Sequence, residues 1–376
     1  MKVYVKPFLH PIFKGTYEIL SKFADVNEIN FDFSRPKVYE SSLRKLYRAI
    51  LQRTPIPKLD YYFEAKYYDL IYSPQSIIPL NRKKFIIEIE SLEMLLRKVP
   101  SIRHTKPMKH ITKKLLFRSD LIKILTYTNA TKESILWYFK DIKNIEQFVE
   151  TSYPVIPENY KKYKKERNET PVIGYACSKG MFYYKGGKIV IDTICRLNRY
   201  EDFKFLIKAD VPKVFIKKME KYGVNFKVIP RVNDMFKEFY SKIDLFLYPS
   251  IMDTFGYVML EAKSMGIPIV ACDYFSTKEV VRNGGMVVPF KYRDLVFDDH
   301  YIVKNPPMFK KDVLKKLILG YEELYTDFIN AIRKLLNDSN FYEECSKNNK
   351  KDVSQGVFSY KHKEKQIKNL LEGITF

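Results

Sequence analysis

The regular alternation of strand-like and helix-like segments after residue 171 constrains the fold most strongly. It starts with a strand, PVIGYACS, and a helix, GGKIVIDTICRLNRY. It continues through FKFLIKAD, PKVFIKKMEKYG, VNFKVIP, VNDMFKEFYSKI, DLFLYPS, IPIVACD and GGMVVPF. Short apolar runs between amphipathic helices are typical of βαβ units, in which helices cover both faces of a parallel sheet. No repeat of fixed period is present, which excludes a solenoid. The sequence therefore predicts a doubly wound parallel sheet in this half.

The first half shows a similar but less regular alternation. KVYVKPFL predicts a strand and GTYEILSKFADV a helix, and YDLIYSPQS and KKFIIEIES predict buried strands. LLFRSDLIKILTYTNATKESILWYF predicts a helix, a strand and a second helix. Prolines bracket the charged segment PVIPENYKKYKKERNETP, which is typical of a linker. We therefore predict domains over 1–158 and 172–340, a linker over 159–171, and closing helices over 341–376.

Composition narrows the possible partners. The net charge is +22, divided as +10 over residues 1–158 and +12 over 159–376, so the excess forms no basic tail. A dispersed excess favours a lysine-rich surface with an anionic ligand or membrane over a nucleic-acid role. The four cysteines form no CxxC pair, and neither a disulfide framework nor a metal site is expected. No signal peptide and no bilayer-spanning run are evident, which indicates a cytoplasmic protein, soluble or peripheral on the inner face of the membrane.

Two carboxylates stand out in the stretch YPSIMDTFGYVMLEAKSMGIPIVACD. Asp253 follows a predicted strand, and Glu261 lies inside the next helix among apolar neighbours. On spacing alone they are either a helix cap with an exposed helix former, or a ligand site. Earlier, the cationic loop KGMFYYKGGK precedes a predicted helix N-terminus, an arrangement that suits a phosphate. A lysine-rich surface loop is the alternative there.

The stretch around these two acids resembles the donor-sugar signature of the retaining family 4 glycosyltransferases (glycosyl transferases group 1). The shared elements are Pro-Ser, an acid, Phe-Gly, Glu-Ala and Gly-x-Pro. IGY…KGG resembles the family's phosphate loop, and VIPRVNDMFKEFYSKIDLFLYPS its base-binding loop and the following helix. GGMVVPF and FSYKHKEKQIKNLL resemble the later Gly-rich strand and the closing helix. The resemblance is specific over about 172–290 and faint before 158.

The resemblance implies the GT-B fold: two Rossmann-like, doubly wound parallel-sheet domains facing across a cleft, with the C-terminal helix returning to the N-terminal domain. The first domain would bind the acceptor and the second a nucleotide-diphosphate sugar. Glu261 would accept hydrogen bonds from the ribose hydroxyls, and Asp253 would contact the sugar. The resemblance implies donor-binding roles for Lys179, Lys185, Gly186, Arg231, Val232, Phe255, Gly256 and Tyr257. No metal or other cofactor is expected, because lysines and helix dipoles can stabilise the leaving diphosphate.

The sequence departs from the family pattern at three points. The first acid of the signature is Asp253, one methylene shorter than the usual Glu. The Arg expected early in the phosphate loop is absent, and Lys179 stands as its substitute. On the acceptor side, Gly15 in FKGT is the only counterpart of a Gly-Gly loop. Glu88 and Glu90 in FIIEIES are the acceptor-side candidates, with a buried structural acid or an exposed strand residue as the alternative.

The basic segment RKVPSIRHTKPMKHITKKLLFR, residues 97–118, mixes cations with apolar side chains. It suits either anionic lipid headgroups or plain solvation. We therefore expect a retaining glycosyltransferase of the hexosyltransferase type that acts on a glycan, polysaccharide or lipid-linked acceptor. A GT-B-shaped binding or assembly subunit without catalysis is the alternative, and a nucleic-acid binder is a third class.

Overall fold

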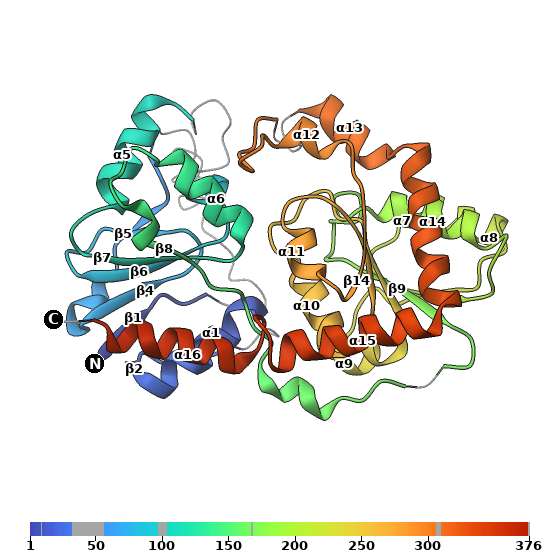
Figure 1. Ribbon diagram of the computed structural model, residues 1–376, viewed down its shortest axis with the longest axis horizontal. Coiled ribbons are helices and arrows are strands. Elements are labelled where there is room, and N and C mark those ends of the chain that lie inside the picture. The colour runs from blue at the N-terminus through green and yellow to red at the C-terminus, as the bar shows by residue number, and fades with distance from the viewer. Residues whose placement is uncertain (9, 32–55, 97–103, 167, 306–309, 375–376) are drawn as a thin grey trace. The chain divides into compact units, whose positions relative to one another are not determined.

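The computed structural model describes residues 1–8, 10–31, 56–96, 104–166, 168–305 and 310–374 (Figure 1). The chain forms two compact units. Unit 1 comprises residues 1–155, 297–304 and 362–376, and unit 2 comprises residues 156–296 and 305–361. Each unit contains its own six-stranded sheet. The chain therefore enters unit 1 three times, although most of that unit comes from the N-terminal half.

The six-stranded sheet of unit 1 is entirely parallel, with strand order β2-β1-β4-β6-β7-β8. Its strands are β1 (Lys2–Val5), β2 (Asp25–Val26), β4 (Leu70–Ser73), β6 (Lys84–Ile89), β7 (Leu121–Thr126) and β8 (Val149–Thr151). A short parallel pair, β3 (Leu59–Asp60) and β5 (Ile78–Pro79), lies apart from it. Every residue of β4 is buried, as expected of a parallel strand covered on both faces.

Local sequence sets the ends of the helices in unit 1. In α1 (Pro11–Phe23) a proline takes the first turn and the Nδ1 atom of His10 accepts from the Ile12 N–H. Threonines cap α5 (Lys106–Leu116) and α6 (Asn129–Tyr138) in the same way. The final helix, α16 (Tyr360–Glu372), runs beside α1 (Figure 1), and Lys22 pairs with Glu364 at 2.8 Å. Shorter helical segments are α3 (Leu92–Leu95), η1 (Phe63–Tyr67) and η2 (Ile145–Gln147).

The sheet of unit 2 is also parallel throughout, in the order β11-β10-β9-β12-β13-β14. Its strands are β9 (Val172–Ala176), β10 (Lys204–Lys208), β11 (Phe226–Val228), β12 (Leu245–Tyr248), β13 (Ile269–Cys272) and β14 (Gly285–Val288). The order turns back between β9 and β12. Loops that leave the carboxyl ends of these two strands therefore diverge, as at the ligand-binding switch point of other open α/β sheets.

The helices of unit 2 follow the predicted alternation. They are α7 (Gly187–Leu197), α8 (Lys213–Lys221), α9 (Met235–Glu238), α10 (Tyr257–Ser264), α11 (Thr277–Val281), α12 (Arg293–Val296), α13 (Lys311–Leu319), α14 (Glu322–Asn337) and α15 (Ser339–Ser354). The short helical segments η3 (Glu158–Lys162) and η4 (Tyr240–Lys242) complete it. The helix expected from VNDMFKEFYSKI is broken into α9 and η4.

The boundaries of the units differ in detail from the predicted ones. The charged segment predicted as a linker packs on unit 2, where Lys165 pairs with Asp244 and the Tyr163 ring stacks on Phe236. The two closing helices separate, since α15 belongs to unit 2 and packs on α10, whereas α16 belongs to unit 1 from residue 362. Residues 297–304 belong to unit 1. Sequence patterning could not find this excursion because the segment forms no helix or strand of its own.

Candidate functional site

The candidate site lies at the carboxyl edge of the unit 2 sheet, where two loops leave neighbouring strands. The loop over 177–186 follows β9 and ends at Gly186, the N-cap of α7. The loop over 249–256 follows β12 and ends at Gly256, the N-cap of α10. Each loop therefore brings the free N–H groups of a helix N-terminus to the same edge.

Asp253 is held by three groups of unit 2. Lys185 Nζ lies 2.5 Å from its Oδ2 atom, and the Tyr248 hydroxyl donates to the same oxygen. The backbone N–H of Thr254 donates to Oδ1 at 3.0 Å. Burial acts to raise the pKa of Asp253, but the Lys185 ammonium and these hydrogen bonds outweigh it and hold the pKa below its usual value. Asp253 is therefore a fixed, ionised carboxylate.

Glu261 occupies a different environment on α10. The Tyr240 hydroxyl lies 2.8 Å from its Oε2 atom and 3.2 Å from the Val258 carbonyl oxygen. Burial raises the pKa of Glu261 to about 7, against the opposing effects of the Tyr240 hydrogen bond and the Lys208 charge. With one neutral donor and no ion pair among the described residues, this carboxylate keeps lone pairs for further donors. This is the arrangement expected of a side chain that accepts hydrogen bonds from hydroxyl groups of a ligand.

Two glycines allow the loops to approach the strands closely. Gly186 has φ +74°, and a Cβ atom there would lie 2.0 Å from the Pro249 carbonyl oxygen. Gly256 has φ +77°, and its Cβ would lie 2.6 Å from the Tyr248 hydroxyl oxygen. No L-residue side chain fits these positions without a shift of backbone or ring. The resemblance gave both glycines donor-binding roles, and the structure shows that both are required for the shape of the edge.

The structure places the other donor-side candidates at varied positions. Lys185 is only 19% exposed and lies between the loops, where it also donates to the Met252 carbonyl at 2.9 Å. Lys179 is exposed in the outer part of its loop. Arg231 is exposed and Val232 half-buried, in the loop after β11.

The Phe255 ring packs inward on Phe358, so only its backbone faces the edge. The Tyr257 N–H opens α10, and its side chain is half-buried.

Sequence reasoning missed three residues that shape this site. Tyr248 and Tyr240 orient the two carboxylates, and Lys208 at the end of β10 contributes positive charge to Glu261. In the sequence, each tyrosine lies in an apolar run, a pattern that predicts a residue of the hydrophobic core. Lys208 could have been found from its place, since it is the last residue of a strand whose carboxyl end meets the site.

On the acceptor side, Glu88 is 1% exposed and fully engaged. The Tyr72 hydroxyl donates to Oε1 at 2.7 Å and the Tyr127 hydroxyl to Oε2 at 3.2 Å. Lys363 of α16, itself 1% exposed, lies 3.5 Å from Oε1 and donates to Ser152 Oγ at 2.7 Å. This geometry favours the buried structural acid that the sequence left open.

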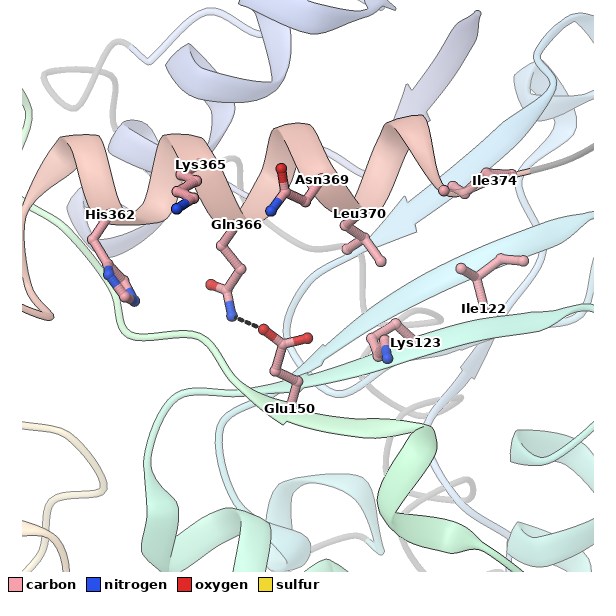
Figure 2. Close-up of a pocket in the computed structure, with 10 residues that line it drawn as sticks. Ile122, Lys123, Glu150, His362, Lys365, Gln366, Asn369, Leu370 and Ile374 are labelled. Carbon is pink, nitrogen blue, oxygen red and sulfur yellow. Dashed lines mark hydrogen bonds between the residues drawn. The ribbon is translucent and has the colours of Figure 1, made fainter.

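A surface cavity of about 680 Å³ lies between α16 and the last two strands of the sheet. Figure 2 shows the Gln366 side chain reaching from α16 to Glu150 on β8. Gln366 also accepts from Ser152 Oγ at 2.6 Å. A chain of polar contacts therefore links the exposed edge of the sheet to the buried pair, and its role is to attach α16.

The remaining acceptor-side candidates also take structural positions. Gly15 lies within α1 and not in a loop, so the comparison with a Gly-Gly loop is wrong in its local geometry. A Cβ there would lie 2.8 Å from Val155 Cγ2, so Gly15 allows close packing of the helix. Glu90 follows β6, its N–H bonded to Ser76 Oγ at 3.2 Å and its carbonyl to Thr131 Oγ1 at 2.8 Å. Its side chain is half-buried.

Within the described ranges, no helix is long and apolar enough to cross a membrane. The same residues contain no group of three or more His, Cys, Asp or Glu that could hold a metal ion.

Comparison with known protein families finds a match over part of the chain. Residues 158–311 match the family described as "Glycosyl transferases group 1". No curated protein matches the chain.

Solved structures match the whole chain. Anabaena Alr3699/HepE in complex with UDP has a TM-score of 0.62 at 14% identity, covering 99% of this chain and 100% of that one. Sucrose-phosphate synthase from Thermosynechococcus elongatus has a TM-score of 0.61 at 12% identity, covering 99% of this chain and 98% of that one. WaaG, a glycosyltransferase involved in lipopolysaccharide biosynthesis, has a TM-score of 0.57 at 15% identity, and the match covers 100% of both chains. The predicted resemblance to glycosyl transferases group 1 is confirmed over residues 158–311, and the predicted GT-B fold is confirmed for the whole chain.

Proposed function

We propose that this protein transfers a sugar from a nucleotide-diphosphate sugar to an acceptor, and that unit 2 binds the donor. The observation that carries the proposal is the pair of unlike carboxylates at one sheet edge. Asp253 is ionised and tied to Lys185, whereas Glu261 is raised in pKa and keeps lone pairs for a ligand. The family match over residues 158–311 supports the same activity. One structural neighbour, Anabaena Alr3699/HepE, was crystallised in complex with UDP and glucose, which supports a nucleotide-sugar donor.

In this proposal each group has a distinct task. Glu261 accepts hydrogen bonds from the ribose hydroxyls, which replace the water it loses on burial. Asp253 accepts from sugar hydroxyls with the lone pairs left by Tyr248, Lys185 and Thr254. The N–H groups at the start of α7 and α10 hold phosphate or sugar oxygens. Arg231 and Val232 lie beside the base, and Lys179 adds charge at the outer phosphate.

Catalysis then rests on stabilising the leaving group. Departure of a nucleoside diphosphate concentrates negative charge on the phosphates, so Lys185 and two helix N-termini act more strongly in the transition state than in the ground state. We infer that these groups take the place of a metal, and that turnover with EDTA equals turnover without it. Transfer with retention and hexosyl specificity are parts of the proposal that rest on the family resemblance. We assign no enzymic nucleophile.

The acceptor is proposed to be a glycan, a polysaccharide or a lipid-linked sugar. WaaG takes part in lipopolysaccharide biosynthesis, which supports this class by likeness of fold. Glu90 is the acceptor-side candidate with a half-buried side chain, whereas Glu88 is sealed by its partners. Product analysis of Glu90→Gln against a panel of glycan acceptors tests this assignment.

A peripheral membrane contact is the remaining part of the proposal. Of the predicted basic segment, residues 97–103 lie outside the described residues. The described part forms α5, whose lysines border a cavity of about 730 Å³ with Phe117 and Ile142 among its lining. Lys109 and Lys113 pair there with Asp141. Cations beside apolar side chains nevertheless suit anionic lipid headgroups. Vesicles rich in anionic lipid should sediment the protein at low salt and release it at high salt, and failure to sediment at low salt rejects this part.

The decisive experiment measures donor binding and turnover. Calorimetry with UDP, GDP and ADP identifies the base, and nucleotide-sugar hydrolysis on a matched donor panel measures catalysis. Glu261→Ala should weaken nucleotide binding by roughly tenfold to a hundredfold, since a hydrogen bond to a charged group is worth about 1.5–3 kcal/mol. Glu343→Ala, at an exposed glutamate of α15, is the matched control and should change neither quantity. Absence of binding to all three nucleotides rejects the proposal, and binding without turnover favours the non-catalytic subunit.

A further inference from the structure

One fully buried lysine has no part in the proposed chemistry. Lys263 is 0% exposed, and it follows Glu261 by two positions on α10. Two positions along a helix turn a side chain by about 200°, so Lys263 projects from the back of the helix that carries Glu261. An aliphatic side chain would fill this core position at a lower desolvation cost.

Three groups of unit 2 engage the Lys263 ammonium. It lies 2.9 Å from Asp352 Oδ2 on α15 and donates to the Val281 carbonyl, the last residue of α11, at 2.9 Å. It also lies over the Phe358 ring, 5.6 Å from the centroid. One side chain therefore joins α10 to α15, α11 and the segment before α16. Burial lowers the pKa of Lys263, and the Asp352 charge opposes that effect.

The helix it joins needs an anchor. α10 has eight residues and its N-cap, Gly256, provides no side-chain hydrogen bond. Helices of this length are marginal without tertiary contacts, so the packing of α10 determines where it lies. A buried ion pair with directed hydrogen bonds permits one rotation. That rotation fixes where Glu261 and the first N–H groups of α10 lie at the sheet edge.

We propose that Lys263 is a positioning residue: through its pair with Asp352 it fixes the rotation of α10, and so the placement of Glu261 for the ribose of the donor. The role rests on the proposed function for its ligand, and on α10 itself for its physical basis. It predicts that removing the pair weakens nucleotide binding even in a protein that is as stable as the wild type.

A double variant separates positioning from stability. Lys263→Met alone leaves Asp352 without its main partner and should destabilise the protein. Lys263→Met with Asp352→Leu replaces the whole pair by apolar side chains, a change that often restores stability. We expect the double variant to melt near the wild-type temperature, to bind the preferred nucleotide among UDP, GDP and ADP roughly tenfold more weakly, and to exchange the amides of α10 faster.

Lys363→Met is the matched control, because Lys363 is equally buried and paired with a carboxylate in unit 1. It should lower stability and leave nucleotide binding unchanged. Wild-type nucleotide binding or wild-type exchange of α10 in the double variant overturns the inference. If the double variant does not fold, Asp352→Asn decides by the same two measurements. Failure of the wild type to bind any nucleotide rejects the proposed function instead, and the exchange of α10 still tests the tether.

Discussion

The two units contain the same kind of sheet but treat their acidic side chains in opposite ways. In unit 2, Asp253 and Glu261 lie where two loops and two helix N-termini meet, and both remain partly exposed. In unit 1, Glu88 lies near the carboxyl end of β6, where a ligand-binding acid would be expected, yet it is closed off by two tyrosines and Lys363. An acid near the end of a parallel strand is thus not by itself a binding group.

The difference lies in what pairs with each carboxylate. Glu88 meets an ammonium that is as deeply buried as itself, so its charge is neutralised inside the protein. Glu261 meets one hydroxyl and, among the residues that the structure describes, no cation within hydrogen-bond reach, so a ligand can supply the missing donors. A sealed pair serves the fold, and an incompletely satisfied acid serves a ligand.

Breaking the sealed pair should have the largest effect on stability. Lys363→Met leaves Glu88 buried without its cation, which typically costs about 3–5 kcal/mol of unfolding free energy. Denaturant unfolding, with hydrogen exchange of the β6 amides, measures the loss. Lys22→Met is the control on the neighbouring contact of α16 with α1, because its pair with Glu364 is partly exposed and should be worth less than about 1 kcal/mol. Equal losses in both variants would contradict a special role for the buried pair.

Removing the charge of Glu261 should raise the free energy of unfolding at neutral pH, the opposite of the effect expected for Lys363→Met. Its pKa of about 7 lies above the ordinary 4.5, so between these values the folded state holds a proton that the unfolded state releases. Its contribution to stability is therefore present at low pH and is lost as pH rises through about 7. As the pH rises from 4 to 8, the unfolding free energy of Glu261→Gln should increase by up to about 3 kcal/mol relative to that of the wild type.

Urea midpoints at four pH values within this range measure the effect. Asp253→Asn provides the opposite case, because the pKa of Asp253 is lowered and its stabilising effect is present at neutral pH. That variant should be less stable than the wild type at pH 7, with the difference shrinking as the pH falls. A stability difference for Glu261→Gln that stays constant with pH would show that Glu261 is ordinary in the folded state.

Glycine substitutions should have smaller effects, on nucleotide binding in unit 2 and on stability alone in unit 1. Gly186→Ala places a methyl group against the Pro249 carbonyl and should weaken nucleotide binding, at about 1–3 kcal/mol of strain. Gly180→Ala has a similar φ, with nothing within 4 Å of its Cβ, and is the matched control for backbone strain alone. Gly15→Ala crowds Val155 and should lower stability without changing nucleotide binding. Thermal melting measures the stability of each variant, and calorimetry measures its nucleotide binding. Weaker nucleotide binding by Gly15→Ala would contradict the division between the units.

Most of the unit 2 architecture could be predicted from the sequence, because local sequence patterns coincide with its strands and helices. Each strand from β9 to β14 was visible as a short apolar run, and Gly186 and Gly256 marked close approaches that local sequence can show. Asp253 and Glu261 were found by spacing and resemblance. Their difference in pKa could not be predicted, because it depends on Tyr248, Tyr240 and Lys185, which reach the acids only in three dimensions.

In unit 1 the sequence was less informative for a physical reason. The partner of Glu88 is Lys363, 275 positions later, and no local pattern connects them. Gly15 was assigned to a loop, yet α1 begins at Pro11, since a proline in the first turn and the His10 cap extend the helix upstream. A closing helix was expected to return to the first domain. Which residues α16 would join, and that α15 would remain with unit 2, could not be read from its amphipathic pattern.

The separation between Glu88 and Lys363 also has a consequence for synthesis. A ribosome makes the chain from the N-terminus, so the strands of unit 1 emerge long before α16 exists. Until then Glu88 and its strand lack the cation that compensates them, and this unit waits in an incomplete state. Unit 2 is continuous apart from one short excursion and ends at residue 361, just before Lys363. The first domain is therefore complete only once the chain has been read through α16.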